Sequence, residues 1–165
     1  MVQIDYELRK KVMDVHIRDT IKYCYQCARC TNGCPVAAAT ENRYDPRIII
    51  LNSFLGVNTF IGEKENFSIW GCTVCDNCDE VCPQKIELTE VFTVLKNMSI
   101  AKGEGPEYFT TQASTIYDHG KAIPSQPAIE RRREQLGLSE IQPPNVEEVQ
   151  KLLNETKLNK ILKKE

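Results

Sequence analysis

The sequence has no long apolar segment and no excess of basic residues. Although 41% of its 165 residues are apolar, no stretch approaches the roughly 18 uninterrupted apolar residues of a membrane-spanning helix. We therefore expect a soluble protein without direct insertion into a membrane. The formal net charge of −2 at pH 7 argues against nucleic acid as a partner, because binding to phosphates requires a basic surface.

The first residues also lack the features of a secretion signal. They read MVQIDYELRKKVMDVHIRD, with no apolar core and no cleavage site, so we expect a cytoplasmic chain whose thiols stay reduced. Histidine is scarce: His16 and His119 are isolated from any cysteine or carboxylate cluster. Catalysis through histidine is therefore not expected.

The sequence is rich in cysteine: its eight cysteines fall into two copies of one spacing. Each copy reads C-x2-C-x2-C-x3-C-P, and equivalent cysteines are 48 residues apart. The first copy is Cys24, Cys27, Cys30 and Cys34 before Pro35; the second is Cys72, Cys75, Cys78 and Cys82 before Pro83. Ferredoxins with two [4Fe–4S] clusters use this spacing. The sequence therefore predicts two [4Fe–4S] clusters.

The spacing also predicts that the two loops exchange ligands. Three cysteines at three-residue steps can turn their sulfurs toward one cube, whereas the fourth, followed by proline, is led to the other cube. We predict Cys24, Cys27, Cys30 and Cys82 on the first cluster, and Cys72, Cys75, Cys78 and Cys34 on the second. Neither cluster is complete until both loops meet, so the cluster-free chain should be largely unfolded.

Two other uses of cysteine fit less well. Zinc sites usually combine two C-x2-C pairs across a longer spacer, whereas here a third cysteine follows after two residues in both copies. A disulfide framework is typical of small secreted domains, and this chain shows no signal for secretion. A zinc-dependent interaction module is the alternative from a different class. Brown colour and acid-labile sulfide in the anaerobically purified protein would exclude it.

Apolar periodicity predicts helices around the cysteine loops. Apolar residues at i, i+4 and i+7 predict an amphipathic helix over residues 5–18. A buried helix over residues 45–56 is predicted from Asp45 as its cap and Gly56 as its end. A further apolar stripe predicts a helix over residues 88–103, packed against the previous one.

The expected fold class is therefore all-α. We predict an α-helical ferredoxin-like domain with both clusters over residues 1–105 and a helical C-terminal extension over residues 106–165. The extension has no cysteine and several prolines, with helical patterns at residues 128–136 and 145–162. Two interpretations stay open: the extension docks onto a partner protein of a complex, which we favour, or it folds back onto its own ferredoxin domain.

The residues around the cysteines resemble one family. The runs YCYQCARCTNGCPV (residues 23–36), YDPR (44–47) and IWGCTVCDNCDEVCP (69–83) are similar to the C subunits of the heterodisulfide reductases of methanogenic archaea. This resemblance covers about residues 21–103. It implies an α-helical ferredoxin that takes electrons from the A subunit, which carries FAD and iron–sulfur clusters. The C subunit passes them to the B subunit, which reduces the heterodisulfide of coenzyme M and coenzyme B in methanogenesis. The A subunit in turn draws on a hydrogenase or a formate dehydrogenase.

The resemblance implies a component of an oxidoreductase complex without a catalytic site of its own. All eight cysteines are assigned to clusters, which leaves none to cleave a disulfide. Within the first loop, two interpretations of Arg29 stay open: its charge raises the potential of the adjacent cluster, or its side chain is merely solvated. The alternatives are a stand-alone two-cluster ferredoxin or an iron–sulfur subunit of fumarate reductase or glycolate oxidase type. Those types would carry further cysteines, in a [2Fe–2S] domain or in catalytic repeats, so we expect the catalytic part on another polypeptide.

Overall fold

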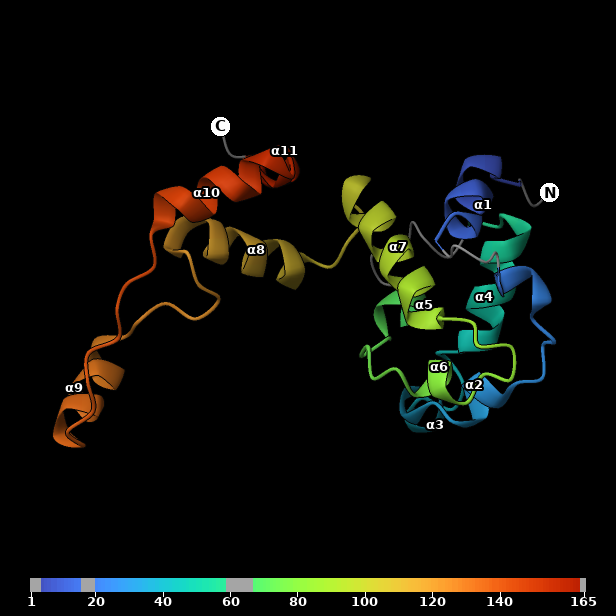
Figure 1. The fold of residues 1–165 in the computed structure, drawn as a ribbon, viewed down its shortest axis with the longest axis horizontal. Helices are drawn as coiled ribbons and strands as arrows, with labels where there is room; N and C mark the ends of the chain where they lie inside the picture. Colours follow the sequence, from blue (N-terminus) through green and yellow to red (C-terminus); the bar gives the residue numbers. More distant parts are fainter. Residues whose placement is uncertain (1–3, 16–19, 59–66, 164–165) are drawn as a thin grey trace. The chain divides into compact units, whose positions relative to one another are not determined.

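The computed structural model describes residues 4–15, 20–58 and 67–163 and divides the chain into two compact units. Unit 1 is Met1–Gly105 and unit 2 is Pro106–Glu165. Each unit consists of helices joined by loops (Figure 1). The described residues contain no β-strand, and Ile4 and Val57 form an isolated antiparallel bridge. The all-α prediction is confirmed for this part of the chain.

Unit 1 combines longer helices with short ones that surround the cysteine loops. The longer helices are α1 (Tyr6–Met13), α4 (Pro46–Leu55) and α7 (Leu88–Ala101). The short elements are the 3-10 helix η1 (Thr20–Tyr23), α2 (Arg29–Asn32), α3 (Pro35–Ala39), α5 (Phe67–Trp70) and α6 (Asn77–Glu80). Since α4 contacts α1, α2 and α7, while α7 also contacts α5 and α6, the longer helices support both loops (Figure 1).

The core of unit 1 lies between α1, α4 and α7. Their buried apolar side chains are Leu8, Val12, Ile49, Ile50, Leu88, Val91, Phe92 and Leu95. Ile21 and Ile69, 48 residues apart, lie just before the two cysteine loops, and each is only 1% exposed. Burying such a side chain stabilises the fold by about 1.5–3 kcal/mol. The apolar core therefore anchors each loop at its start.

The helix predicted between the motifs is confirmed in its bounds. Asp45 caps α4 by accepting a hydrogen bond from the Ile48 backbone N–H at 3.2 Å, and Pro46 takes the first helical position. Gly56 ends the helix with φ 76°, a left-handed conformation that favours glycine. The prediction that this helix is well buried is only partly right, because Ile49 and Ile50 are buried whereas Ile48 and Leu55 are exposed.

The helix predicted after the second motif is also confirmed. α7 ends at Ala101, followed by Lys102 as its cap and by Gly103 with φ 74°. It contacts α4, as predicted. Its first turn is capped from a distance, since an Asp79 carboxylate oxygen accepts a hydrogen bond from the Thr89 N–H at 3.2 Å.

The N-terminal helix is shorter than predicted. α1 ends at Met13, and Asp14 and Val15 form a turn, whereas the pattern predicted a helix through residue 18. Val15 still packs against the core, so an apolar residue at i+7 can be satisfied from a turn as well as from a helix. At the other end, the Asp5 carboxylate accepts a hydrogen bond from the Leu8 N–H at 2.9 Å, which lowers the pKa of Asp5. Residue 16, a histidine, lies outside the described residues.

Unit 2 contains α8 (Glu107–His119), α9 (Pro127–Gln135), α10 (Val146–Glu155) and α11 (Leu158–Leu162). The predicted pattern at residues 145–162 corresponds to two helices, because Lys157 is left-handed with φ 62° and interrupts it. α8 is not among the predicted helices: its middle is rich in threonine and serine, which have low helix propensity.

Three of the unit 2 helices, α8, α10 and α11, pack on one another (Figure 1). Tyr117 of α8 is buried, its hydroxyl donates a hydrogen bond to Asn154 Oδ1 at 3.1 Å, and its carbonyl accepts one from Gln150 Nε2 at 3.0 Å. No other side chain in the described part of unit 2 is buried to the same degree. The core of unit 2 is therefore thin.

Within the described ranges, the structure offers no helix that could cross a membrane. The longest helix of unit 1, α7, has 14 residues. A spanning helix needs about 20 predominantly apolar residues.

Candidate metal centre

The two cysteine loops have the same backbone conformation. Gln26 and Val74, 48 residues apart, have φ of 56° and 53°, and Ala28 and Asp76 have φ of 62° and 59°. Non-glycine residues rarely adopt this left-handed conformation, which costs about 1–2 kcal/mol per residue. Matched strain at both copies indicates that the surrounding fold holds the two loops in the same conformation.

A one-turn helix follows the strained positions in each loop. α2 and α6 occupy equivalent positions, and each brings the third cysteine of its loop into its first turn. The fourth cysteine comes next: the Cys34 N–H donates to the Thr31 carbonyl at 3.1 Å, and the Cys82 N–H donates to the Asp79 carbonyl at 3.2 Å. The repeat seen in the sequence is therefore also a repeat of backbone structure.

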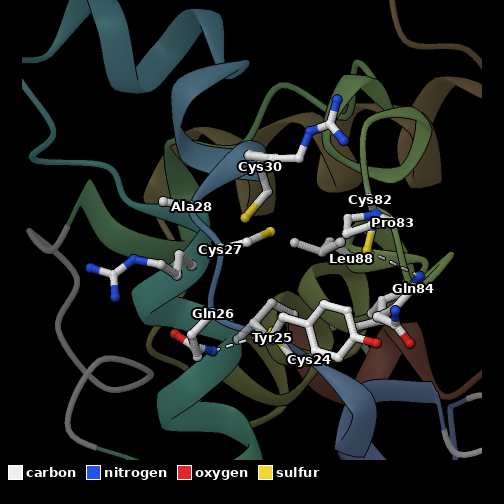
Figure 2. A pocket seen from close by; sticks show the side chains of 14 residues that line it. Cys24, Tyr25, Gln26, Cys27, Ala28, Cys30, Cys82, Pro83, Gln84 and Leu88 are labelled. Atoms are coloured by element: carbon white, nitrogen blue, oxygen red, sulfur yellow. Dashed lines mark hydrogen bonds between the residues drawn. The ribbon is translucent and has the colours of Figure 1, made fainter.

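The eight cysteines line two cavities. The first cavity is lined by Cys24, Cys27 and Cys30 from the first loop and by Cys82 from the second. The second cavity is lined by Cys72, Cys75 and Cys78 from the second loop and by Cys34 from the first. Figure 2 shows Cys27, Cys30 and Cys82 pointing into the first cavity, with Pro83 and Leu88 beside them. The structure thus brings together the same two groups of four that the spacing predicted.

The donor set fits clusters better than single metal ions. All eight cysteines are free thiols, so no pair forms a disulfide. Among the described residues, no three cysteine, histidine or carboxylate side chains converge on a point where one ion could be bound. Zinc would need its four sulfurs about 2.3 Å from one centre. A [4Fe–4S] cube instead takes one thiolate on each of its four irons, so that its ligands lie farther apart.

Among the described residues, N–H groups donate hydrogen bonds to cysteine sulfur atoms of both loops. The donors and acceptors are Gln26 Nε2 to Cys24 Sγ (3.3 Å), Ala37 N to Cys34 Sγ (3.5 Å), Val74 N to Cys72 Sγ (3.4 Å) and Ile86 N to Cys82 Sγ (3.4 Å). Such bonds stabilise a thiolate and are one of the ways in which a protein sets a cluster potential. The role of Gln26 was missed, although it lies between the first two cysteines of its loop.

Burial separates the cysteines within each loop. The second cysteine of each loop, Cys27 or Cys75, is exposed, whereas the third, Cys30 or Cys78, is more enclosed. Burial raises the pKa of Cys30 to about 11. Burial also raises the pKa of Cys78, and the neighbouring Asp79 carboxylate adds to the effect. Iron must therefore displace protons from these two thiols, and each site is closest to solvent at its second cysteine.

Three further side chains at these sites come from helices or loops outside the motifs. Arg47 of α4 lines the first cavity together with Arg29 of the first loop. Tyr44, which is 1% exposed, lines the second cavity. Burial is the main cause that raises the pKa of Tyr44, and the charge of the nearby Cys72 adds to it. Lys96 of α7 donates a hydrogen bond to the Cys72 carbonyl at 2.8 Å. Arg29 was expected from the sequence. Tyr44 and Arg47 belong to the YDPR run that carries the family resemblance, but neither they nor Lys96 were given a role at a cluster.

Comparison with known proteins agrees with this geometry. Residues 20–86 match the family model described as a 4Fe-4S dicluster domain. A CoB–CoM heterodisulfide reductase iron–sulfur C subunit of Methanocaldococcus jannaschii, the one numbered 2, is 32% identical over 162 residues, which cover 94% of this chain and 84% of the relative. The chain belongs to the family of heterodisulfide reductase C subunits. The resemblance recognised in the sequence is thereby confirmed.

Two more members of this family extend the comparison. The C subunit of the H2:CoB–CoM heterodisulfide,ferredoxin reductase of Methanothermobacter thermautotrophicus is 28% identical, with coverage of 96% of this chain and 86% of the relative. The C subunit of the ferredoxin:CoB–CoM heterodisulfide reductase of Methanosarcina mazei is also 28% identical, with coverage of 81% and 80%. With the dicluster match and eight cysteines, the expected cofactor, two [4Fe–4S] clusters, is confirmed.

Proposed function

We propose that this chain is the electron-transfer subunit of a heterodisulfide reductase complex. It relays electrons from the A subunit, which carries FAD and iron–sulfur clusters, to the B subunit, which reduces the heterodisulfide of coenzyme M and coenzyme B. The arrangement of eight cysteines around two cavities carries this proposal. A [4Fe–4S] cluster supplies reversible one-electron chemistry.

The chain's own residues hold the clusters and exclude water from them. We assign Cys24, Cys27, Cys30 and Cys82 to the first cluster and Cys72, Cys75, Cys78 and Cys34 to the second, because these groups line the same cavities. Apolar walls from Ile50, Ile86 and Leu88 close the first cavity, and Val36 with Tyr44 closes part of the second. Every cysteine is then a ligand, so the chain conducts electrons and leaves the disulfide chemistry to another polypeptide.

The two units have separate tasks in this proposal. Residues 1–105 bind the clusters, and residues 106–165 dock onto another protein of the complex. Support for docking comes from the apolar side chains that unit 2 leaves exposed: Ile123 (80%), Ile129 (55%), Leu136 (59%), Leu138 (50%) and Leu152 (68%). Tyr117 is the one buried side chain in the described part of unit 2, so these apolar side chains have no cover within unit 2, and a protein partner would supply it. A stand-alone two-cluster ferredoxin, the second candidate function, would have no use for them.

The upstream donor differs among the named relatives, since one name specifies H2 and another ferredoxin. We propose the A subunit as the direct donor, supplied by a hydrogenase or a formate dehydrogenase. Iron–sulfur subunits of the fumarate reductase and glycolate oxidase types are disfavoured, because the relatives described above are named for heterodisulfide reductases and align over most of the chain.

Anaerobic co-expression of the chain with the A and B subunits of the same organism tests the function. We expect a brown complex with about eight irons and eight sulfides bound to this chain. Reduction of the A subunit should then reduce the chain, and addition of the B subunit with heterodisulfide should reoxidise it. A chain that purifies alone and stays oxidised in the presence of the reduced A subunit would contradict the proposal.

A further inference from the structure

The two cavities differ in charge although their backbones match. Arg29 and Arg47 line the first cavity, which has no acidic lining residue among the described ones. Asp76 is the charged residue that lines the second cavity, and Asp79 lies next to it, with Oδ1 3.5 Å from Cys78 Sγ. The same scaffold thus surrounds one site with positive charge and the other with negative charge.

The difference arises at equivalent positions of the repeat. Asp76 corresponds to Ala28, and both have the same left-handed conformation. Asp79 corresponds to Thr31, and Asn77 corresponds to Arg29. Relative to the first loop, the second loop has therefore gained two carboxylates and lost one guanidinium at these positions.

Hydrogen bonds hold two of these charges in place. Asp79 accepts hydrogen bonds from the Thr89 N–H at 3.2 Å and from the Thr89 hydroxyl, so its carboxylate stays beside Cys78. The Arg47 backbone N–H donates to Thr31 Oγ1 at 3.3 Å, which fixes the start of α4, and the Arg47 guanidinium itself lies 3.9 Å from the Asp45 carboxylate. The charges near Cys78 and at the first cavity are therefore parts of the folded structure.

Two opposite charges reduce the contrast without removing it. Asp45 offsets part of the charge of Arg47, and Lys96 donates a hydrogen bond to the Cys72 carbonyl at 2.8 Å. With these included, the first site keeps the net positive charge of Arg29, whereas the second keeps one net negative charge. Interactions of charges with an added electron are strong in a partly buried site, where water screens them poorly.

We infer that the Cys24 site has a higher reduction potential than the Cys72 site, so that an electron on this chain resides at the Cys24 site. This inference rests on the proposed function. Positive groups stabilise the more negative, reduced state of a cluster, and carboxylates destabilise it. The transfer from the second site to the first moves one electron, oxidising the former and reducing the latter, and it makes or breaks no bond. Electron transfer from the second loop's site to the first loop's site is therefore thermodynamically favourable.

A potentiometric titration of the full chain with both clusters, followed by electron paramagnetic resonance, tests the order. Two one-electron waves are expected. Arg29→Gln and Ala28→Asp should each shift the higher wave to more negative potential and leave the lower wave in place. Asp76→Asn and Asp79→Asn should shift the lower wave to more positive potential. Asp is well tolerated in the left-handed conformation of Ala28. Asn at position 79 keeps an acceptor oxygen for the Thr89 N–H, and its NH2 group can donate to the Thr89 hydroxyl oxygen in place of accepting from it.

A matched control and the contrary outcomes complete the test. Lys10→Gln removes an exposed charge on α1, away from both cavities, and should move neither wave. A shift of the lower wave by Arg29→Gln, or of the higher wave by Asp76→Asn, would reverse the order and overturn the inference while leaving the proposed function intact. A wild-type chain that binds far fewer than eight irons would overturn the proposed function, and this inference with it.

Discussion

The side-chain amide of Asn77 donates a hydrogen bond to the backbone carbonyl of Gly33 and thereby joins the second cysteine loop directly to the first. Gly33 precedes Cys34, the cysteine that lines the cavity of the opposite loop. The contact therefore stands where the chain crosses from one site to the other. α6, which begins at Asn77, also contacts α2, which ends just before Gly33. The two loops consequently form one structural unit, as shared ligands would require.

Crossed ligation makes a prediction about the fourth cysteines. Cys34→Ser should disturb the cluster held by Cys72, Cys75 and Cys78, and Cys82→Ser should disturb the one held by Cys24, Cys27 and Cys30, because each substitution removes a thiolate from the opposite cavity. Iron analysis with electron paramagnetic resonance of each variant measures the loss.

The control for this pair is Thr40→Ser, which keeps the hydroxyl that donates to the Val36 carbonyl at 2.7 Å and touches neither set of ligands. It should keep both signals. Loss of the signal from the substituted cysteine's own loop, with the other signal intact, would refute the crossed assignment.

Two glycines with the same backbone conformation should tolerate alanine differently. A Cβ at Gly56 would lie 2.7 Å from the Asp5 carbonyl oxygen, whereas a Cβ at Gly103 would have no neighbour within 4 Å. Both have positive φ, so Gly103→Ala should cost about 1–2 kcal/mol of stability from the backbone alone. Gly56→Ala should cost more, since the link between α1 and the end of α4 must also move. Thermal unfolding of the cluster-loaded variants compares them. Equal losses would show that the close approach at Gly56 is relieved without penalty.

Removing a helix cap should affect only the unit that contains it. Asp45→Ala removes the cap of α4 and the acceptor for the Thr31 hydroxyl at 2.6 Å, so we expect a loss of about 1–2 kcal/mol in unit 1. Asn145→Ala removes the cap of α10, where the Glu148 N–H donates to Asn145 Oδ1 at 3.3 Å, and should cost about 1 kcal/mol in unit 2. Hydrogen exchange resolved by segment measures both. Loss of protection in the cluster loops of Asn145→Ala would contradict this expectation.

The proposed docking role of unit 2 makes a prediction about its surface. Leu152→Glu places a charge on a side chain that is 68% exposed on α10, so the free chain should fold normally. Association with the A and B subunits should weaken by about tenfold or more, because a charge buried in an apolar interface is costly. The adjacent exposed Lys151→Glu serves as the control for charge. Binding measured with the cluster-loaded chain compares the two. If Leu152→Glu binds as well as the unmodified chain, the interface does not include this face of α10.

Much of the site was predictable because its information is local. The cysteine spacing predicted two clusters, since three-residue steps and a following proline act within one loop. The assignment of ligands to each cluster stays a prediction. The cap at Asp45 and the stop at Gly56 were readable for the same reason. The predicted end of α1 was wrong, because an apolar pattern also fits a turn at Val15. The sequence missed α8, because packing against α10 stabilises a segment of weak helix propensity.

The sequence by itself determined the cofactor, the family and the repeated loop, because each depends on residues close together in the chain. Only the tertiary structure decided which charges from outside the loops reach each site. Arg47 reaches the first site from α4, and Lys96 reaches the Cys72 carbonyl from α7, across 24 residues. Such contacts depend on how helices pack, and no local pattern encodes them. The loops alone therefore identify an electron carrier, and the folded chain sets the order of its two sites.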